Sequence, residues 1–209
     1  MRTDDLIQAL AADARPEGAT DRRVLPWLLP AVVLSLAGLL VTMGARPDLA
    51  HALTTFVPAM RHVLTLSLFG LALAAALITT RPEGRARLWP LAVVATAALA
   101  MLLWAYATTP PGARVTALMG TSYNICVLVI PLMSILPVAA LFTALRSGAS
   151  TTPTLTGALI GLAGGGAGAA VYAVHCTESS PLFYVTWYGL AILAVTAVSA
   201  LIGRRVLRW

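Results

Sequence analysis

The sequence contains no lysine, and charged residues of every kind are scarce. Asp, Glu, Lys and Arg together make up 11% of the 209 residues, whereas 59% are hydrophobic. A soluble domain carries about 25% charged residues, so this deficit excludes an ordinary water-soluble globular protein. We therefore expect a chain that is solvated largely by lipid.

Sequence signals of catalysis are also missing. The chain has no GxSxG or HExxH motif and no pair of carboxylates within an apolar run. We expect neither an enzyme nor a resident cofactor. The interiors of the apolar runs also lack the ionisable residues that ion or proton pathways usually need. A small transporter or channel remains as the alternative, because Pro131 and Pro137 should kink the fourth run.

The basic residues are dispersed rather than clustered. All 14 are arginines that separate apolar runs, and we expect none inside a span. Direct nucleic-acid binding needs a basic stripe or patch, so we do not expect it. No cleavable signal peptide is expected either, because the first 23 residues are polar and acidic.

Six apolar runs approach the roughly 20 residues that cross a hydrocarbon core about 30 Å thick. They occupy residues 24–43, 56–79, 88–107, 123–145, 153–174 and 182–203. The fold class that they predict is an all-α, polytopic membrane protein with six transmembrane helices. The chain then divides into an N-terminal segment (1–23), a transmembrane domain (24–203) and a basic C-terminal tail (204–209).

The arginines also predict the orientation of the spans. If the N-terminus is cytoplasmic, only Arg46, Arg61 and Arg114 of the 14 arginines fall outside. This excess on the inner side follows the positive-inside rule, so both termini are expected in the cytoplasm.

The only two cysteines and all three histidines fall at or near the outer ends of the spans. Cys126 begins the fourth span and Cys176 follows the fifth, next to His175. Three interpretations remain open for the cysteines. They are inert small apolar residues, or they form a disulfide whose loop of about 50 residues contributes roughly 4 kcal/mol. The third is a thiol pair that oxidises or binds a soft metal, with His175 or Glu178 as a further ligand.

The fifth span is rich in glycine at spacings of four, as in Gly157, Gly161 and Gly165. Small residues four apart allow another helix to approach closely, which predicts helix packing and a possible homodimer. A phosphate-binding loop is excluded, because no Lys-Ser or Lys-Thr pair follows the glycines.

The first residues predict a short amphipathic helix. Thr3 is placed to cap it, Asp4 and Asp5 lie in its first turn, and Leu6, Ile7 and Leu10 share one face. A helix of about a dozen residues is marginal alone in water, so it needs something to pack against. The alternative is a frayed tail without function.

These features together resemble the NrsF-type family of bacterial integral-membrane anti-sigma factors. The matching features are the opening Thr3 to Asp13, Cys126 ahead of Pro131, and His175-Cys176 followed by Ser179, Trp187 and Tyr188. The resemblance covers essentially the whole chain. It implies six spans in the bacterial inner membrane and an extracytoplasmic-function sigma factor as the partner.

The resemblance also implies roles for particular residues. Cys126 and Cys176 match the paired cysteines that bear on stress sensing, and a transient soft-metal site would include Cys126, Cys176 and His175. The cytoplasmic parts would face the sigma factor, with the arginine loop at 81–87 able to share the contact. The residues expected to bind this partner are Asp4, Asp5, Leu6, Ile7, Leu10 and Asp13. We expect a change at the cysteines to alter the packing of the fourth and fifth spans and to release the partner.

Overall fold

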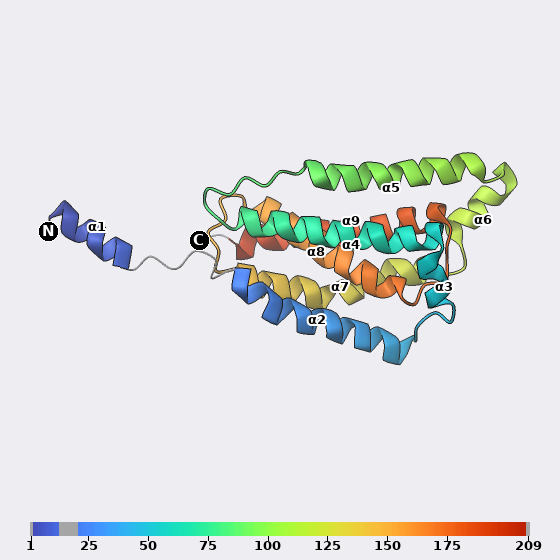
Figure 1. Cartoon of the computed structure of the whole chain (residues 1–209), viewed down its shortest axis with the longest axis horizontal. Helices are drawn as coiled ribbons and strands as arrows, with labels where there is room; N and C mark the ends of the chain where they lie inside the picture. The colour runs from blue at the N-terminus through green and yellow to red at the C-terminus, as the bar shows by residue number, and fades with distance from the viewer. Residues whose placement is uncertain (1, 13–20, 208–209) are drawn as a thin grey trace.

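The computed structural model describes residues 2–12 and 21–207, and over these residues it contains helices and no strand (Figure 1). Its elements are α1 (Thr3–Ala12), α2 (Asp21–Thr42), α3 (Leu49–Thr54), α4 (Phe56–Thr79), α5 (Trp89–Thr108), the 3₁₀ helix η1 (Pro111–Ala113), α6 (Arg114–Met119), α7 (Tyr123–Leu145), α8 (Pro153–Ala173) and α9 (Pro181–Val206).

Six of the described helices, α2, α4, α5, α7, α8 and α9, are long and apolar enough to cross a membrane. The prediction of an all-α protein with six spans is therefore confirmed. Two boundaries differ from the prediction by more than one residue. The helix α2 begins at Asp21, and α9 continues to Val206, so Arg204 and Arg205 lie in its last turn rather than in a separate tail. Cations there complement the partial negative charge of the helix C-terminus.

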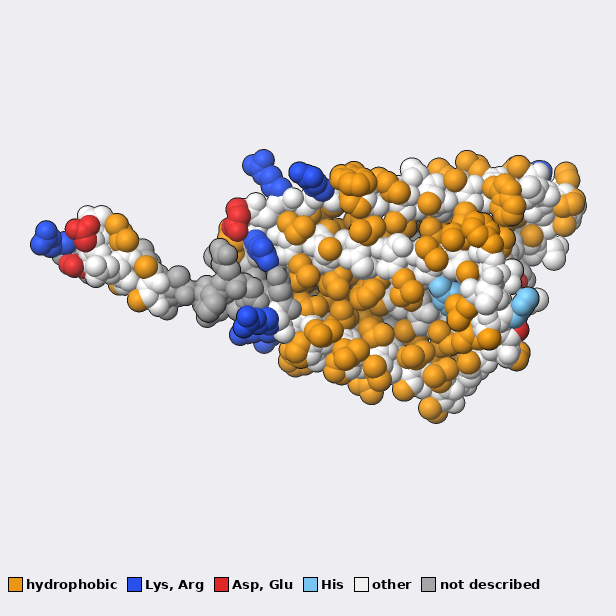
Figure 2. Space-filling model, in the orientation of Figure 1, with side chains coloured by type: hydrophobic (Ala, Val, Ile, Leu, Met, Phe, Trp, Pro, Cys, Tyr) orange, Lys and Arg blue, Asp and Glu red, His pale blue; other side chains and the backbone are white. Residues whose placement is uncertain are grey.

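Successive spans run in opposite directions, so the connections gather at two ends of the bundle (Figure 1). We call one of them the cysteine end; it holds residues 43–55, 109–122 and 174–180. The other is the arginine end, with residues 80–88, 146–152 and 204–207. Figure 2 shows arginine side chains gathered at this second end, where the chain also enters and leaves the bundle.

The glycine-rich helix α8 is the central element of the bundle, and most of its side chains are buried. Its glycines contact three different helices of the same chain. A Cβ on Gly157 or Gly161 would collide with α9, one on Gly164 or Gly168 with α7, and one on Gly166 would press on the α4 backbone. The prediction that these glycines allow close helix packing is confirmed. The predicted homodimer through them stays a prediction, and helices of the same chain occupy these glycine faces.

The connection before α7 contains a sharp turn. The sequence predicts that the region after residue 113 is too long for one straight span, and the structure breaks it at Gly120, whose φ is +53°. A Cβ there would lie 2.7 Å from the Phe183 ring, so only glycine fits both the backbone and the space. The short helix α3 lies in the connection from α2 to α4, which was predicted as loop.

The helix α5 lies at the side of the bundle, mainly against α4 and α9 (Figure 1). Ala105 is its only buried residue, and Val93, Leu99, Leu103 and Trp104 are exposed. Exposed apolar surface on this scale would be unusual on a soluble monomer and suits contact with lipid tails.

Candidate functional site

The candidate site is built around the connection from α8 to α9, residues 174–180, at the cysteine end. It contains Cys176, which is 2% exposed, and it faces the first turn of α7, which contains the fully buried Cys126. The two side chains lie within hydrogen-bonding reach of each other. Both are free thiols, so the disulfide, one of the three interpretations left open by the sequence, is not formed in this structure.

Two buried tyrosines complete a cluster around the thiols. The Cys126 Sγ lies 3.3 Å from the Tyr172 hydroxyl oxygen, and the rings of Tyr172 and Tyr188 are 5.8 Å apart. These four residues, which we call the cysteine–tyrosine cluster, come from α7, α8, α9 and the α8–α9 connection. The two thiols therefore lie where three spans meet.

Arg61 of α4 holds this connection in place. Its side chain is 1% exposed. Its guanidinium donates to the carbonyl oxygens of Glu178 at 2.7 Å, Ala173 at 3.2 Å and Cys176 at 3.1 Å. The last carbonyls of a helix have no partner within it, so an arginine from another helix can satisfy them.

The position of Arg61 corrects the sequence analysis, which placed every arginine outside the spans. Arg61 lies more than one turn inside α4 and is buried. Counting the charges in each loop treated Arg61 as a signal of membrane orientation, although its side chain donates hydrogen bonds to backbone carbonyls. The signal that could have identified it is an ionisable residue within an apolar run, which is a functional hypothesis by default.

Arg46, in the connection between α2 and α4, also binds the α8–α9 connection. It donates to the Cys176 carbonyl oxygen at 3.1 Å and, through its backbone N–H, to that of Val174 at 3.0 Å. It also forms a two-pronged ion pair with Asp48, with both distances at 2.8 Å. This pair raises the pKa of Arg46 and lowers that of Asp48. The Cys176 carbonyl thus accepts from two buried arginines, of which only Arg46 has a carboxylate partner among the described residues.

These contacts favour the ionised form of Cys176. Hydrogen bonding from Cys126 lowers the pKa of the Cys176 thiol, and the Arg61 charge lowers it further, against the opposing effect of burial. The thiolate is the nucleophilic and metal-binding form of cysteine. Cys176 is therefore set up to react or bind more readily than an ordinary buried thiol.

The structure does not bring a third metal ligand to the two thiols. The His175 Nδ1 lies 3.0 Å from the Gly44 carbonyl oxygen and must donate to it. The Glu178 carboxylate instead accepts from the Thr121 N–H at 2.8 Å and from the Thr121 hydroxyl at 2.7 Å. Over the described residues, no three His, Cys, Asp or Glu side chains are grouped to hold a metal ion. Metal binding by Cys126, Cys176 and His175 stays a prediction and would require these contacts to rearrange.

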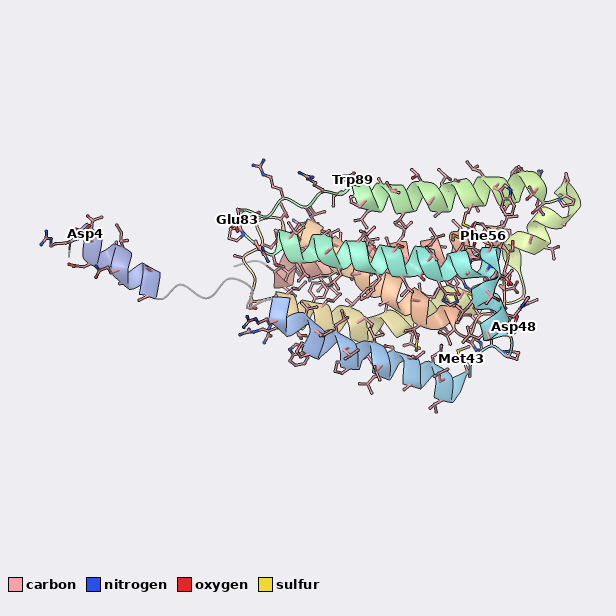
Figure 3. All side chains as sticks on the ribbon, in the orientation of Figure 1. Asp4, Met43, Asp48, Phe56, Glu83 and Trp89 are labelled. Atoms are coloured by element: carbon pink, nitrogen blue, oxygen red, sulfur yellow. The ribbon has the colours of Figure 1, made fainter. Side chains whose placement is uncertain are left out.

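The predicted partner-binding residues lie at the other end of the molecule. Figure 3 shows Asp4 on α1, far from Asp48 at the cysteine end. Asp4 and Asp5 are exposed, and so are Leu6 (43%) and Ile7 (58%). The side chain of Leu10 and the whole of Asp13 lie outside the described residues.

Comparison with known proteins identifies the family. A family model described as "NrsF: Negative regulator of sigma F" matches residues 10–209, so this match begins after Asp4 to Ile7. The chain is 37% identical over 218 residues to "Anti-sigma-F factor NrsF" of Caulobacter vibrioides (strain NA1000 / CB15N). It is 32% identical over 219 residues to "Probable anti-sigma-F factor NrsF" of Azospira oryzae (strain ATCC BAA-33 / DSM 13638 / PS). Both alignments cover 100% of each chain.

No solved structure matches this chain. The family model and the two full-length relatives agree on the same kind of protein, a regulator rather than an enzyme. The chain belongs to the NrsF family of negative regulators of sigma F.

Proposed function

We propose that this protein holds an extracytoplasmic-function sigma factor inactive at the bacterial inner membrane and releases it on a signal received at the cysteine end. Membership of the NrsF family is the observation that carries the proposal, since the relatives are named as anti-sigma-F factors. The six spans supply the membrane anchor. The excess of arginine at the end where the chain enters and leaves the bundle favours a cytoplasmic location for that end.

The helix α1 supplies the contact with the sigma factor. It has ten residues, and Leu6 and Ile7 expose an apolar stripe that nothing in the described chain covers. Such a short helix is marginal alone, so packing against a partner would stabilise it. Asp4 and Asp5 on the same helix suit basic residues on that partner. Occluding the surface that a sigma factor needs for polymerase or promoter requires no catalysis.

The test of this contact replaces Leu6, Ile7 and Leu10 together with serine. We expect the sigma factor recovered with the membrane protein from unstressed cells to fall at least tenfold, because the apolar face is its anchor. Transcription from the sigma-dependent promoter should rise correspondingly. The matched control replaces Gln8 and Ala12, which lie away from this face, with serine and should retain the partner. Equal recovery of the sigma factor with both variants would show that the contact lies instead in the loops at the arginine end.

The cysteine–tyrosine cluster supplies the sensor. Two free thiols within reach of each other can form a disulfide, giving two protons and two electrons to an external oxidant, or can bind a soft metal. Either change would draw Cys176 towards α7 and alter a connection that α4, α7, α8 and α9 share. A change in their packing would then reach the arginine end through the spans.

The test of this role replaces Cys126 and Cys176 together with serine. Serine keeps the size and a hydrogen-bonding group but forms no disulfide and binds soft metals poorly. We expect the double variant to repress the promoter normally and to lose induction by a thiol oxidant, by a soft-metal salt, or by both. Normal induction by both treatments would disprove the sensing role. Loss of repression without stress would instead show that the thiols are structural.

The alternative of a transporter is not favoured by a specific observation. The helix α7 continues through Pro131 and Pro137 and packs closely on α8 at Ser134. The one buried cation described within a span, Arg61, is bound to backbone carbonyls of its own chain.

A further inference from the structure

Both thiols of the cysteine–tyrosine cluster are closed off from the surroundings of the protein. Cys126 is 0% exposed and Cys176 is 2% exposed. A dissolved oxidant or metal ion therefore reaches neither sulfur until some part of the cysteine end moves aside. The two sides of the cluster differ in how firmly they are held, and this difference indicates which part can move.

The side formed by α4 and the α2–α4 connection is held by buried arginines. Arg61 and Arg46, which are 1% and 5% exposed, each donate to the Cys176 carbonyl oxygen at 3.1 Å. Arg61 also donates to the carbonyl oxygens of Ala173 and Glu178. Hydrogen bonds from charged donors are stronger than those between neutral groups. Opening this side would leave buried charges without their acceptors, which is costly.

The opposite side consists of residues 109–122, which contain η1 and α6 and which we call the lid segment. None of its residues is buried. Among the described contacts, two side chains anchor it to the bundle. The Trp187 Nε1 donates to the Leu118 carbonyl oxygen at 2.7 Å, and the Glu178 carboxylate accepts from Thr121. A segment with few buried contacts and exposed hydrogen bonds opens at a low cost in free energy, so this side can move.

The C-terminal end of the lid segment lies against both thiols. The side chain of Ser122 is within hydrogen-bonding reach of the Cys126 thiol. Glu178, whose carboxylate binds Thr121, has its backbone within hydrogen-bonding reach of the Cys176 thiol. A movement of the lid segment therefore uncovers the two sulfurs directly.

Glycines lie near both ends of the lid segment. Gly120, with its φ of +53°, packs on Phe183, whose 0% exposed ring belongs to the same buried cluster as both cysteines. A Cβ on Gly112 would meet nothing within 4 Å, so no neighbour confines that position. Hinges are a few residues that absorb large changes in φ and ψ, and they are often small. The lid segment can thus turn about its two ends while α7 and α9 stay in place.

We propose that the lid segment controls the access of water-soluble reagents to Cys126 and Cys176. In the closed position, which the structure describes, the Trp187 indole and the Glu178 carboxylate hold it over the thiols. In the open position an oxidant or a soft metal ion reaches them from the aqueous phase. The proposal deepens the sensing role proposed above and rests on it for its purpose, but access to the thiols can be measured without any signal.

The two anchors can be removed without disturbing the buried arginines. Glu178→Ala removes the carboxylate but keeps the backbone carbonyl that Arg61 binds. Trp187→Phe keeps an aromatic ring and removes the donor to the lid segment. The control, Thr55→Val, also removes a hydrogen bond at the cysteine end, that from the Thr55 hydroxyl to the His51 carbonyl oxygen, but on a residue outside the lid segment.

The experiment measures how fast iodoacetamide, which is small, neutral and water-soluble, alkylates the two cysteines of the folded full-length protein in lipid nanodiscs. We expect the rate to rise at least threefold in each single variant and at least tenfold in the double variant, and to stay unchanged in Thr55→Val. Hydrogen–deuterium exchange should rise over residues 109–122 but not over α8. Thermal unfolding checks that each variant is folded, and the single variants decide the result if the double variant is not.

Two results would overturn the proposal. An unchanged alkylation rate in folded variants that lack the anchors would show that reagents reach the thiols by another path. A faster rate with an equal rise in exchange over α8 would show a general loosening of the bundle instead of a moving lid segment. Both results come from the purified protein, whereas the sensing role is decided by promoter induction in the Cys126 and Cys176 double variant. The failure of one proposal is therefore distinguishable from the failure of the other.

Discussion

Replacing Arg61 with methionine is expected to detach the α8–α9 connection from α4 and to raise the pKa of Cys176. Methionine keeps much of the apolar volume but removes the donors to Glu178, Ala173 and Cys176. Each buried acceptor that loses its donor costs about 1–3 kcal/mol, but the variant also removes a buried charge. We therefore expect a net loss of about 2 kcal/mol in the free energy of unfolding rather than the full sum.

The sign of the pKa change follows from the charge. Arg61 favours the Cys176 thiolate, so its removal raises the pKa of Cys176 and leaves less thiolate at neutral pH. The pH dependence of modification by a small methanethiosulfonate reports this, because the thiolate is the reactive form. The midpoint should move to higher pH. The plateau rate at high pH should increase, because the connection is less firmly held.

Two control variants separate charge from packing. Arg87→Met changes an exposed arginine at the arginine end and should alter neither stability nor the midpoint. Arg46→Met removes one donor to the Cys176 carbonyl, but the Arg46 charge is already compensated by Asp48. It should shift the midpoint less than Arg61→Met does. An unchanged midpoint and stability in Arg61→Met would contradict the role assigned to Arg61.

The spans were predictable because hydropathy and length alone define them. The predicted run at 56–79 coincides with α4, and that at 123–145 coincides with α7. In a lipid environment every backbone group must be satisfied within the segment, so a long apolar run has few structures other than a helix. The length of the run after residue 113 predicted a break before α7, but the sequence did not place the turn at Gly120.

The contacts around the cysteines were only partly predictable. That Cys126 and Cys176 lie close follows from neighbouring spans that meet at one end. The direction of His175 does not, because it depends on the Gly44 carbonyl, 131 residues away in the chain. The role of Arg61 depends in the same way on carbonyls more than 100 residues away. Spacing along one chain does not reveal such partners.

The glycine motif illustrates the same limit. A GxxxG spacing predicts that a helix approaches closely, but not which helix it is. Three helices of the same chain fill this role around α8, so the packing of the bundle depends on these glycines.

Replacing Gly168 with alanine is expected to separate α7 from α8 and to move Cys126 away from Cys176. The added Cβ would lie 2.8 Å from the Ser134 backbone nitrogen and 3.0 Å from the Ile130 carbonyl oxygen. Backbone atoms cannot move aside unless the whole helix shifts, so we expect a loss of about 1–3 kcal/mol in the free energy of unfolding. Cys126 lies on the same helix, about one turn from Ile130. The yield of the Cys126–Cys176 disulfide with a mild thiol oxidant should therefore fall.

Gly165→Ala is the matched control, three residues away on the same helix. Its Cβ would meet the Ile192 Cγ2 at 3.2 Å, a side-chain methyl that can shift by a few tenths of an ångström. This variant gains the better helix propensity of alanine, up to about 1 kcal/mol, and should keep the disulfide yield unchanged. Stability and disulfide yield should both fall in Gly168→Ala, and neither should fall in Gly165→Ala. Equal yields in the two variants would show that the approach of Cys126 to Cys176 does not depend on the α7–α8 contact. The thiols would then be positioned by the α8–α9 connection and its arginines alone.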